Sequence, residues 1–265
     1  TYLNTDYFTK GLEETTIFQD KTGKYYTKTK NTYKGVPVAE NAWKRFNSKY
    51  YFLNTKETFY YEGKDEEGEF TIATKEGYNY DTYGNVTAFT DFGDVNDLTD
   101  DVSARIEYSY KNSTYVMNRP SVIRVFDVGG KMLRKREGLY DTRGNLIEHK
   151  TSIDEETEAV VNLAYNTYGN LVTFTGPDNN RGQRYRLNYT YDGETQTYVT
   201  SVRDSFGLTS SARYEYKYGN LLYSTDTNGN SMAYSYDNRG RVRKVTGPYD
   251  FGGSLPTVAS SYRDA

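Results

Sequence analysis

The chain has 265 residues, of which 35% are hydrophobic, with 33 basic and 36 acidic side chains and no cysteine. Its length is enough for one sizeable domain or two small ones. A formal charge of −3 argues against nucleic-acid binding through a large basic face, and a chain without cysteine has no disulfide framework and no thiolate zinc site.

Hydropathy and tyrosine content further restrict the fold class of the chain. No apolar run is long enough for a membrane-spanning helix, so we expect no membrane insertion by this segment. The chain starts at Thr1 without a basic and apolar leader, and we expect any targeting segment to lie outside it. Thirty tyrosines, whose rings pack while their hydroxyls reach water, predict an all-β chain with a large wetted surface.

Residues 1–76 carry a strand-and-turn pattern only weakly, and we predict an irregular N-terminal β-region there. This region holds the one helix candidate, residues 38–46. Pro37 precedes it, and apolar residues including Trp43 and Phe46 are spaced for one helical face. We predict at most a single short helix or helical turn, packed on the sheet.

Residues 77–265 are dominated by a repeated tetrad, Asp-x-x-Gly, with alternating aromatic residues before it and an apolar residue after it. Asp at the first position of a type I turn accepts backbone amides, and Gly at the fourth adopts a positive φ without strain. A type I turn followed by such a glycine connects two antiparallel strands. We assign these corners to Asp81, Gly84, Asp127, Gly130, Asp141, Gly144, Gly169, Asp204, Gly207, Asp226, Gly229, Asp237 and Gly240.

Other tetrads repeat the signature less regularly, and Asn166 replaces Asp before Gly169. The glycines late in the chain are 10 to 12 residues apart, which leaves strands of about 5–7 residues between corners. The remaining Asp-x-x-Gly tetrads begin at Asp20, Asp65 and Asp250.

Candidate chemistry is sparse, and we predict no catalytic, cofactor-binding or metal-binding residues. The sole histidine, His149, lies in a strand pattern without a cysteine or a Gly-x-Ser-x-Gly motif nearby. Acidic pairs such as Glu155-Glu156 lie in turn-like, solvated contexts. The acidic loop 91–101 has enough oxygens for Ca²⁺ but lacks the EF-hand order, so a flexible loop is favoured and a calcium site stays open.

Three strings, YDTYGN at 80–85, YDTRGNL at 140–146 and YDNRGRV at 236–242, closely resemble the YD repeats of the RHS family. The resemblance covers about residues 77 to 247. The family includes bacterial Rhs proteins, the B and C components of insecticidal Tc toxin complexes and animal teneurins, and the irregular insertions here look most like the B-component branch. Rhs and C-type members end in a self-cleaving segment built around Asp-Pro, which this chain lacks.

The resemblance implies consecutive antiparallel hairpins in a curved, shell-like sheet, of which 265 residues would form a partial cocoon. It implies a non-enzymatic structural segment of a secreted or surface-exposed bacterial protein, enclosing a toxin or effector. The implied partners are an encapsulated effector polypeptide or other shell subunits of a toxin complex. The alternative is a cell-surface adhesin or a carbohydrate- or protein-binding module that uses a tyrosine-rich sheet face, with a glycan as ligand.

Overall fold

The structure, a computed structural model, describes residues 1–37, 49–111 and 114–262. In these ranges the chain forms eighteen β-strands and no α-helix. Each strand with a recorded pairing runs antiparallel to its neighbour in the sequence, so the predicted all-β fold of consecutive hairpins is confirmed. The helix predicted over residues 38–46 lies outside the described residues.

The chain divides into two compact units, which are described separately. The predicted division into an irregular region, 1–76, and a repeat region, 77–265, concerns the regularity of the repeat and stays a prediction. The units comprise Thr1–Gly144 with Asp154–Glu156 (unit 1) and Asn145–Ile153 with Thr157–Ala265 (unit 2).

Unit 1 is a run of eight strands, each paired with the next. Its second and third strands are the longest of the chain and form one extended hairpin. The strands are β1 (Thr15–Gln19), β2 (Tyr25–Pro37), β3 (Lys49–Lys64), β4 (Ile72–Tyr80), β5 (Val86–Asp94), β6 (Val102–Lys111), β7 (Val116–Asp127) and β8 (Met132–Tyr140).

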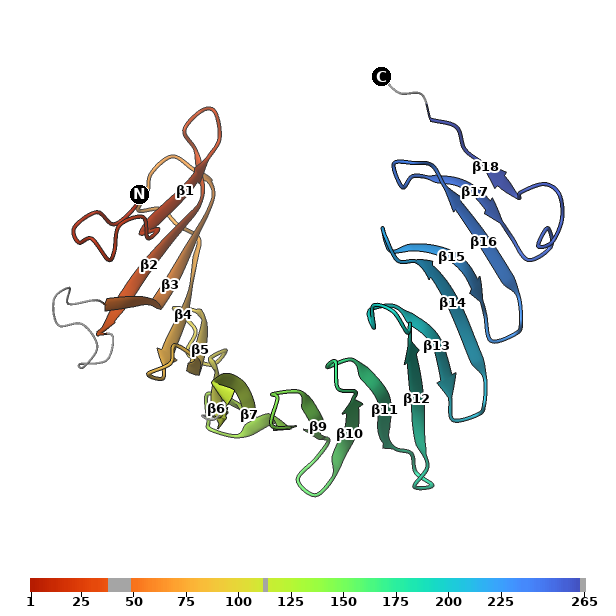
Figure 1. The fold of residues 1–265 in the computed structure, drawn as a ribbon. Coiled ribbons are helices and arrows are strands. Elements are labelled where there is room, and N and C mark those ends of the chain that lie inside the picture. Colours follow the sequence, from red (N-terminus) through yellow and green to blue (C-terminus); the bar gives the residue numbers. More distant parts are fainter. Residues whose placement is uncertain (38–48, 112–113, 263–265) are drawn as a thin grey trace. The chain divides into compact units, whose positions relative to one another are not determined.

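Unit 2 is a run of ten shorter strands that lie side by side in chain order and follow a curved path (Figure 1). The five strands between Val199 and Thr246 have five to seven residues, as the spacing of the late corners predicted. The strands are β9 (Leu146–Ser152), β10 (Glu158–Tyr165), β11 (Leu171–Asp178), β12 (Arg184–Tyr191), β13 (Val199–Asp204), β14 (Thr209–Glu215), β15 (Asn220–Thr225), β16 (Ser231–Tyr236), β17 (Val242–Thr246) and β18 (Val258–Ala259).

Very little of the described chain is a closed core. Tyr61 and Ala73, both in unit 1, are the only buried hydrophobic residues in the described ranges. A sheet normally buries one face against a second layer of structure. The sheet of unit 2 has no buried hydrophobic side chain among its described residues, and both of its faces remain accessible.

The two faces of unit 2 differ in chemistry. Leu163 pairs with Phe174 and Phe174 pairs with Leu187, so these three side chains form a continuous row across β10, β11 and β12. We call the side that carries this row the apolar face. Residues offset by one lie on the opposite side, which we call the polar face; there Asn188 pairs with Arg203.

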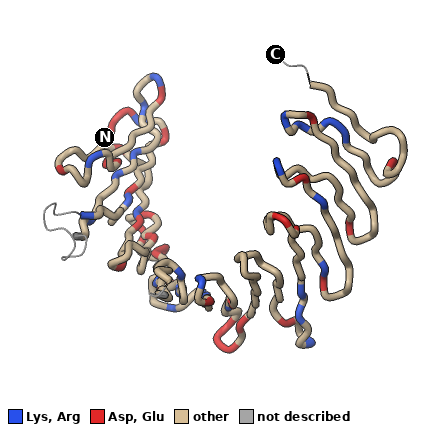
Figure 2. Tube along the Cα trace, in the orientation of Figure 1, with Lys and Arg blue, Asp and Glu red and all other residues tan. Residues whose placement is uncertain are grey.

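Charged residues are unevenly distributed along the chain. Figure 2 shows Lys and Arg positions both on strands and at loop tips, and runs of acidic positions in several connecting loops. Two of these acidic runs, residues 65–69 and 91–101, belong to unit 1. The local charge of the chain is therefore uneven although its net charge is small.

Candidate functional site

The predicted corners share one hydrogen-bond pattern, which the corner at Asp237 illustrates. The backbone N–H groups of Arg239 and Arg241 both donate to Oδ1 of Asp237 at 2.9 Å. The N–H of Gly240 donates to the carbonyl of Asp237 at 3.0 Å, and Gly240 has a φ of 78°. The side chain thus fixes the turn while the glycine supplies the left-handed conformation that closes it.

The same geometry recurs at the other predicted corners. At Asp127 the side-chain bond comes from Lys131 N, and at Asp141 it comes from Arg143 N. Each corner glycine has a positive φ. Both the second and the fourth following amide donate to the first side chain of the tetrad at Asp20, Asp81, Asn166, Asn179, Asp204, Asp226 and Asp237.

The corner at Asn179 was not among those predicted from the sequence. Oδ1 of Asn179 accepts the N–H groups of Arg181 and Gln183 at 2.9 and 3.0 Å, and Gly182 has a φ of 70°. An amide oxygen accepts these bonds as a carboxylate does. Because Asn166 was already recognised as a substitute for Asp, the same rule applied to residues 179–182 would have found this corner.

Two tetrads do not form the predicted corner. Gly68, in the tetrad that starts at Asp65, has no positive φ, and the turn closes one residue later with Glu69 N donating to the Glu66 carbonyl. In the tetrad of Asp250 the positive φ belongs to Gly252. Here the Asp250 carboxylate accepts the hydroxyl of Thr257 at 2.6 Å instead of capping its own turn.

Neighbouring hairpins are tied at their corner ends by tyrosine hydroxyls. In each case a tyrosine donates to a backbone carbonyl on the preceding strand, at 2.8 to 3.0 Å. The pairs are Tyr80 to Leu53, Tyr108 to Val86, Tyr140 to Pro120, Tyr191 to Leu171, Tyr236 to Leu221 and Tyr262 to Val242.

These bonds lie just beyond the end of the backbone hydrogen-bond ladder between two hairpins. Between β15 and β16 the last pair is Tyr223 with Ala233. The acceptor Leu221 lies two residues beyond this pair, and the donor Tyr236 lies three residues beyond it. The same offsets hold for all six bonds, so the tyrosine hydroxyl replaces the missing rung and satisfies a carbonyl.

This finding corrects one expectation. The sequence predicted tyrosine hydroxyls in water, whereas these six are bonded to the backbone. Burial raises the pKa of Tyr80, Tyr108, Tyr140 and Tyr236 above the usual value, because the charged tyrosinate is poorly solvated there. Four of these tyrosines directly precede the Asp of a corner and are part of that corner: Tyr80, Tyr140, Tyr191 and Tyr236.

Asp192 forms a different and tighter corner. Its side chain is buried, and its two carboxylate oxygens accept the backbone N–H groups of residues 194–198 and the hydroxyl of Thr195. Burial alone would raise the pKa of Asp192, but the hydrogen bonds from Tyr198, Thr195 and Thr197 outweigh it and hold the pKa well below its usual range. This cap was not predicted, because the loop after Asp192 has no glycine three residues later.

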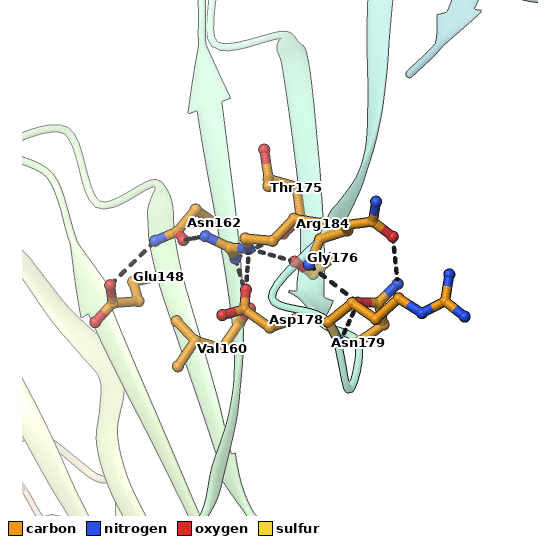
Figure 3. Close-up of polar contacts among 10 residues, drawn as sticks. Glu148, Val160, Asn162, Thr175, Gly176, Asp178, Asn179 and Arg184 are labelled. Carbon is orange, nitrogen blue, oxygen red and sulfur yellow. Dashed lines mark hydrogen bonds and ion pairs between the residues drawn. The ribbon is translucent and has the colours of Figure 1, made fainter. Parts of the chain in front are cut away.

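Arg184 closes a gap in the ladder of unit 2 beside the Asn179 corner (Figure 3). The pairing of β11 with β12 is interrupted between Thr175 and Asp178. The guanidinium of Arg184 donates to the carbonyls of Gly176 at 2.7 Å, Thr175 at 3.3 Å and Val160 at 2.6 Å. One charged side chain thus satisfies carbonyls on two neighbouring strands.

The network around Arg184 continues across the polar face. Its Nη1 donates to Oδ1 of Asn162 at 2.8 Å, and Nδ2 of Asn162 donates to Glu148 at 3.0 Å (Figure 3). An ion pair joins Arg184 Nε to Asp178 at 3.1 Å, but Asp178 is largely exposed and contributes little. The arrangement is that of a structural clamp, with every polar group of Arg184 turned toward the backbone or toward a neighbouring side chain.

One corner carboxylate also binds a tyrosine of the next hairpin. Oδ2 of Asp81 accepts Tyr110 Oη at 2.7 Å and Nδ2 of Asn85 at 2.9 Å. The hydrogen bond to Asp81, together with burial, raises the pKa of Tyr110 to about 12. Burial would raise the pKa of Asp81, but the bonds from Asn85 and Tyr110 lower it overall, so the carboxylate is ionised at neutral pH.

The residues considered for catalysis and metal binding take part in strand pairing or in the structure of a connection. His149 is in β9 and pairs with Val161 of β10. Of the segment 91–101, which was expected to be an acidic loop, residues 91–94 are the end of β5 and only residues 95–101 connect it to β6. Asp94 accepts Asn96 N at 3.0 Å and Asp97 accepts Thr99 N at 2.9 Å, so these carboxylates shape the turn itself. In the described part of the chain, no three His, Cys, Asp or Glu side chains are grouped so as to hold a metal ion.

Membrane insertion was considered separately. Within the described ranges, no helix has the length and apolar character needed to cross a bilayer.

The row of capped corners joined by tyrosine bonds defines a class of fold, the repeated β-hairpin sheet. No protein-family model matches the sequence, and no curated protein matches it. Solved structures do match it, and structures of Tc toxin proteins are among them.

The chain is similar to the crystal structure of TcdB2-TccC3-Cdc42, with a TM-score of 0.68 and 12% identity over 90% of this chain and 16% of that one. The structure of TcdB2-TccC3 gives a TM-score of 0.67 at 13% identity, over 90% and 17% of the two chains. TcdB2-TccC3 without the hypervariable C-terminal region gives 0.66 at 12% identity, over 89% and 16%.

These similarities establish the fold. The chain spans about a sixth of the length of the structures that it matches. The likeness to Tc toxin proteins agrees with the fold that the YD-like strings implied. What the matched structures bind or enclose enters only as a proposal for this chain.

Proposed function

We propose that this chain is a non-enzymatic structural segment of a secreted or surface-displayed bacterial protein, forming part of a β-shell that encloses a toxin or effector polypeptide. The observation that carries the proposal is the uncovered apolar face of unit 2. The row of Leu163, Phe174 and Leu187 has no second layer of structure on it among the described residues. Such a face needs an occupant, and an enclosed polypeptide is one.

The hydrogen bonds support a role in which the sheet must persist with both faces accessible. A sheet with little core has to draw stability from its own ladder and from its corners. The tyrosine bonds and the Arg184 clamp add bonds where the ladder is interrupted. The similarity in fold to Tc toxin proteins supports the same proposal.

The alternative is a module that binds a glycan or a protein through aromatic side chains. One observation favours it: the rings of Tyr185 and Phe206 lie 6.2 Å apart and both are exposed. Exposed aromatic rings can stack on the apolar faces of sugars. The two proposals differ in the residues used, which are the row of Leu163, Phe174 and Leu187 for enclosure and the exposed ring pair for glycan binding.

Cysteine footprinting tests the enclosure. The chain has no cysteine, so Leu187→Cys on the apolar face and Asn188→Cys on the polar face each introduce one thiol. A reduced, carboxymethylated polypeptide, which stays unfolded, is added and the rate of maleimide labelling is measured. We expect slower labelling of the Leu187→Cys variant and an unchanged rate for Asn188→Cys.

Two results would overturn the proposal. Equal labelling rates with and without the polypeptide in both variants would show that the apolar face has no such occupant. Saturable binding on a glycan array that is lost in Phe206→Ala would favour the adhesin instead.

A further inference from the structure

Unit 1 contains an apolar pocket that is separate from the corners and from the faces of unit 2. It has a volume of about 360 Å³, within the range of ligand-binding pockets. Its lining residues are Glu57, Phe59, Phe70, Ala73, Lys75, Phe92, Val95 and Leu98. The floor comes from β3, β4 and β5, and the walls come from the connections that follow β3 and β5.

Specific contacts preform the pocket. The rings of Phe59 and Phe70 pack edge to face with centroids 5.1 Å apart. Phe92 lies over Gly77, where a Cβ would be 3.3 Å from its ring, so the absence of a side chain there gives the ring its place. Val95 N donates to the Ala73 carbonyl at 2.9 Å and fixes the loop against β4.

The pocket remains open although its lining is apolar. Leu98 is 70% exposed, and Phe70 and Val95 are each 39% exposed. The two charged lining residues neutralise each other, because Lys75 Nζ lies 3.1 Å from Glu57. The pocket itself therefore offers apolar contact and little net charge.

Both walls of the pocket are strongly acidic. We call residues 65–69 and 91–101 the acidic rims, since Phe70 directly follows the first and the second contains Val95 and Leu98. Two of the rim carboxylates are matched by lysines, Asp65 by Lys24 and Glu67 by Lys28. The rims contain no Lys or Arg; their acidic residues are Asp65, Glu66, Glu67, Glu69, Asp91, Asp94, Asp97, Asp100 and Asp101.

We propose that this pocket binds a basic polypeptide segment, which inserts one bulky apolar side chain between Phe59, Phe70 and Leu98 while its Lys and Arg residues meet the acidic rims. Charge complementarity selects this occupant: an apolar anchor alone would suit the pocket, but only a cationic segment also suits both rims. The loop 91–101 is ordered for this role by its own hydrogen bonds, including Asp94 N to Asp100 at 3.1 Å.

Binding of short fluorescent peptides to the whole chain tests the proposal. The probe has one phenylalanine flanked by lysines. One control peptide has glutamates in place of the lysines, and another has serine in place of the phenylalanine. We expect the first peptide to bind and both controls to bind at least about tenfold more weakly, with the affinity of the first falling as salt screens the rims.

Matched variants locate the site. Leu98→Ser changes an exposed side chain, so folding is expected to be retained, and it should weaken binding about tenfold. Phe206→Ala removes an equally exposed ring from unit 2 and should leave binding unchanged. Gly93→Ala provides a third test, because its Cβ would lie 2.1 Å from the Asp100 carboxylate and would displace the second rim without removing a pocket residue.

Three results would overturn the proposal. Equal binding of the lysine and glutamate peptides would remove the charge argument. Equal effects of Leu98→Ser and Phe206→Ala would place the binding elsewhere. Self-association of the chain that Leu98→Ser abolishes, without peptide binding, would identify a second copy of this chain as the occupant.

Discussion

The hydrogen bond from Tyr236 to the Leu221 carbonyl gives the sharpest test of how the sheet is held together. Tyr236→Phe removes one hydroxyl and keeps the ring that packs on the sheet. The bond is 2.8 Å long and joins two uncharged groups, so its net contribution to the free energy of unfolding is about 1 kcal/mol, with a range of about 0.5–1.5 kcal/mol. For a chain of this size the melting temperature should fall by about 2–4 °C for each kcal/mol lost.

The assay is urea unfolding followed by far-UV circular dichroism, with Tyr249→Phe as the control because Tyr249 is fully exposed. Tyr191→Phe removes the equivalent bond to Leu171, and the double variant should lose about 2 kcal/mol because the two bonds share no partner. Hydrogen exchange should accelerate at β15 and β16 in Tyr236→Phe. If Tyr236→Phe and Tyr249→Phe unfold at the same urea concentration, the tyrosine bonds do not stabilise the sheet.

The remaining predictions concern the corners. Gly229→Ala should lower the free energy of unfolding by about 1–2 kcal/mol, because a φ of 85° is strained for alanine although no atom lies within 4 Å of the new Cβ. Gly144→Ala should lower it further, since its Cβ would be 2.9 Å from Val116. Equal unfolding midpoints of the two variants would contradict this expectation. The folded-state pKa of Asp192 is lowered, so its contribution to stability should be full above about pH 4 and should disappear as the pH falls below that value; Asp192→Asn should flatten the acid limb of stability measured by urea unfolding. The folded-state pKa of Tyr110 is raised to about 12 from 10, so its contribution to stability should be full below pH 10 and disappear as the pH rises through 12. A titration of tyrosinate absorbance checks this, and the assignment is refuted when Tyr110→Phe loses no late titration step.

The corners could be predicted from the sequence because their chemistry is local. Asp237, its two following amides and Gly240 lie within five residues, so the tetrad contains nearly all the groups that form the turn. The failure at Asp250 has the converse explanation, because a residue outside the tetrad takes part. At Asp250 the carboxylate is taken by Thr257, seven residues later, and the tetrad carries no information about that competitor.

The bonds between hairpins could not be predicted, because they depend on where a backbone ladder stops. The sequence showed that a tyrosine often precedes the corner Asp, and its alternation placed the ring on a strand. Which carbonyl the hydroxyl of Tyr236 reaches depends on the register of β15 with β16, which ends at Tyr223 and Ala233. Arg184 is similar, since its partners are carbonyls exposed by an irregularity in the pairing of β11 with β12.

The pocket in unit 1 could not be predicted for a related reason: its lining combines side chains of three strands with side chains of two connections that are far apart in the sequence. Loop 91–101 was considered as a calcium site because of its carboxylates, while Val95 and Leu98 between them were given no role.

The stability of this sheet and its capacity to bind a partner have a common origin. A compact domain uses its apolar side chains to hold itself together, and few remain for a ligand. In unit 2 the ladder, the capped corners and side chains such as Tyr236 and Arg184 satisfy the backbone, so the row of Leu163, Phe174 and Leu187 is left accessible. Variants that weaken the corners should therefore lower stability without altering the chemistry of the apolar face, and variants on that face should alter binding at a smaller cost in stability than equivalent changes in a closed core.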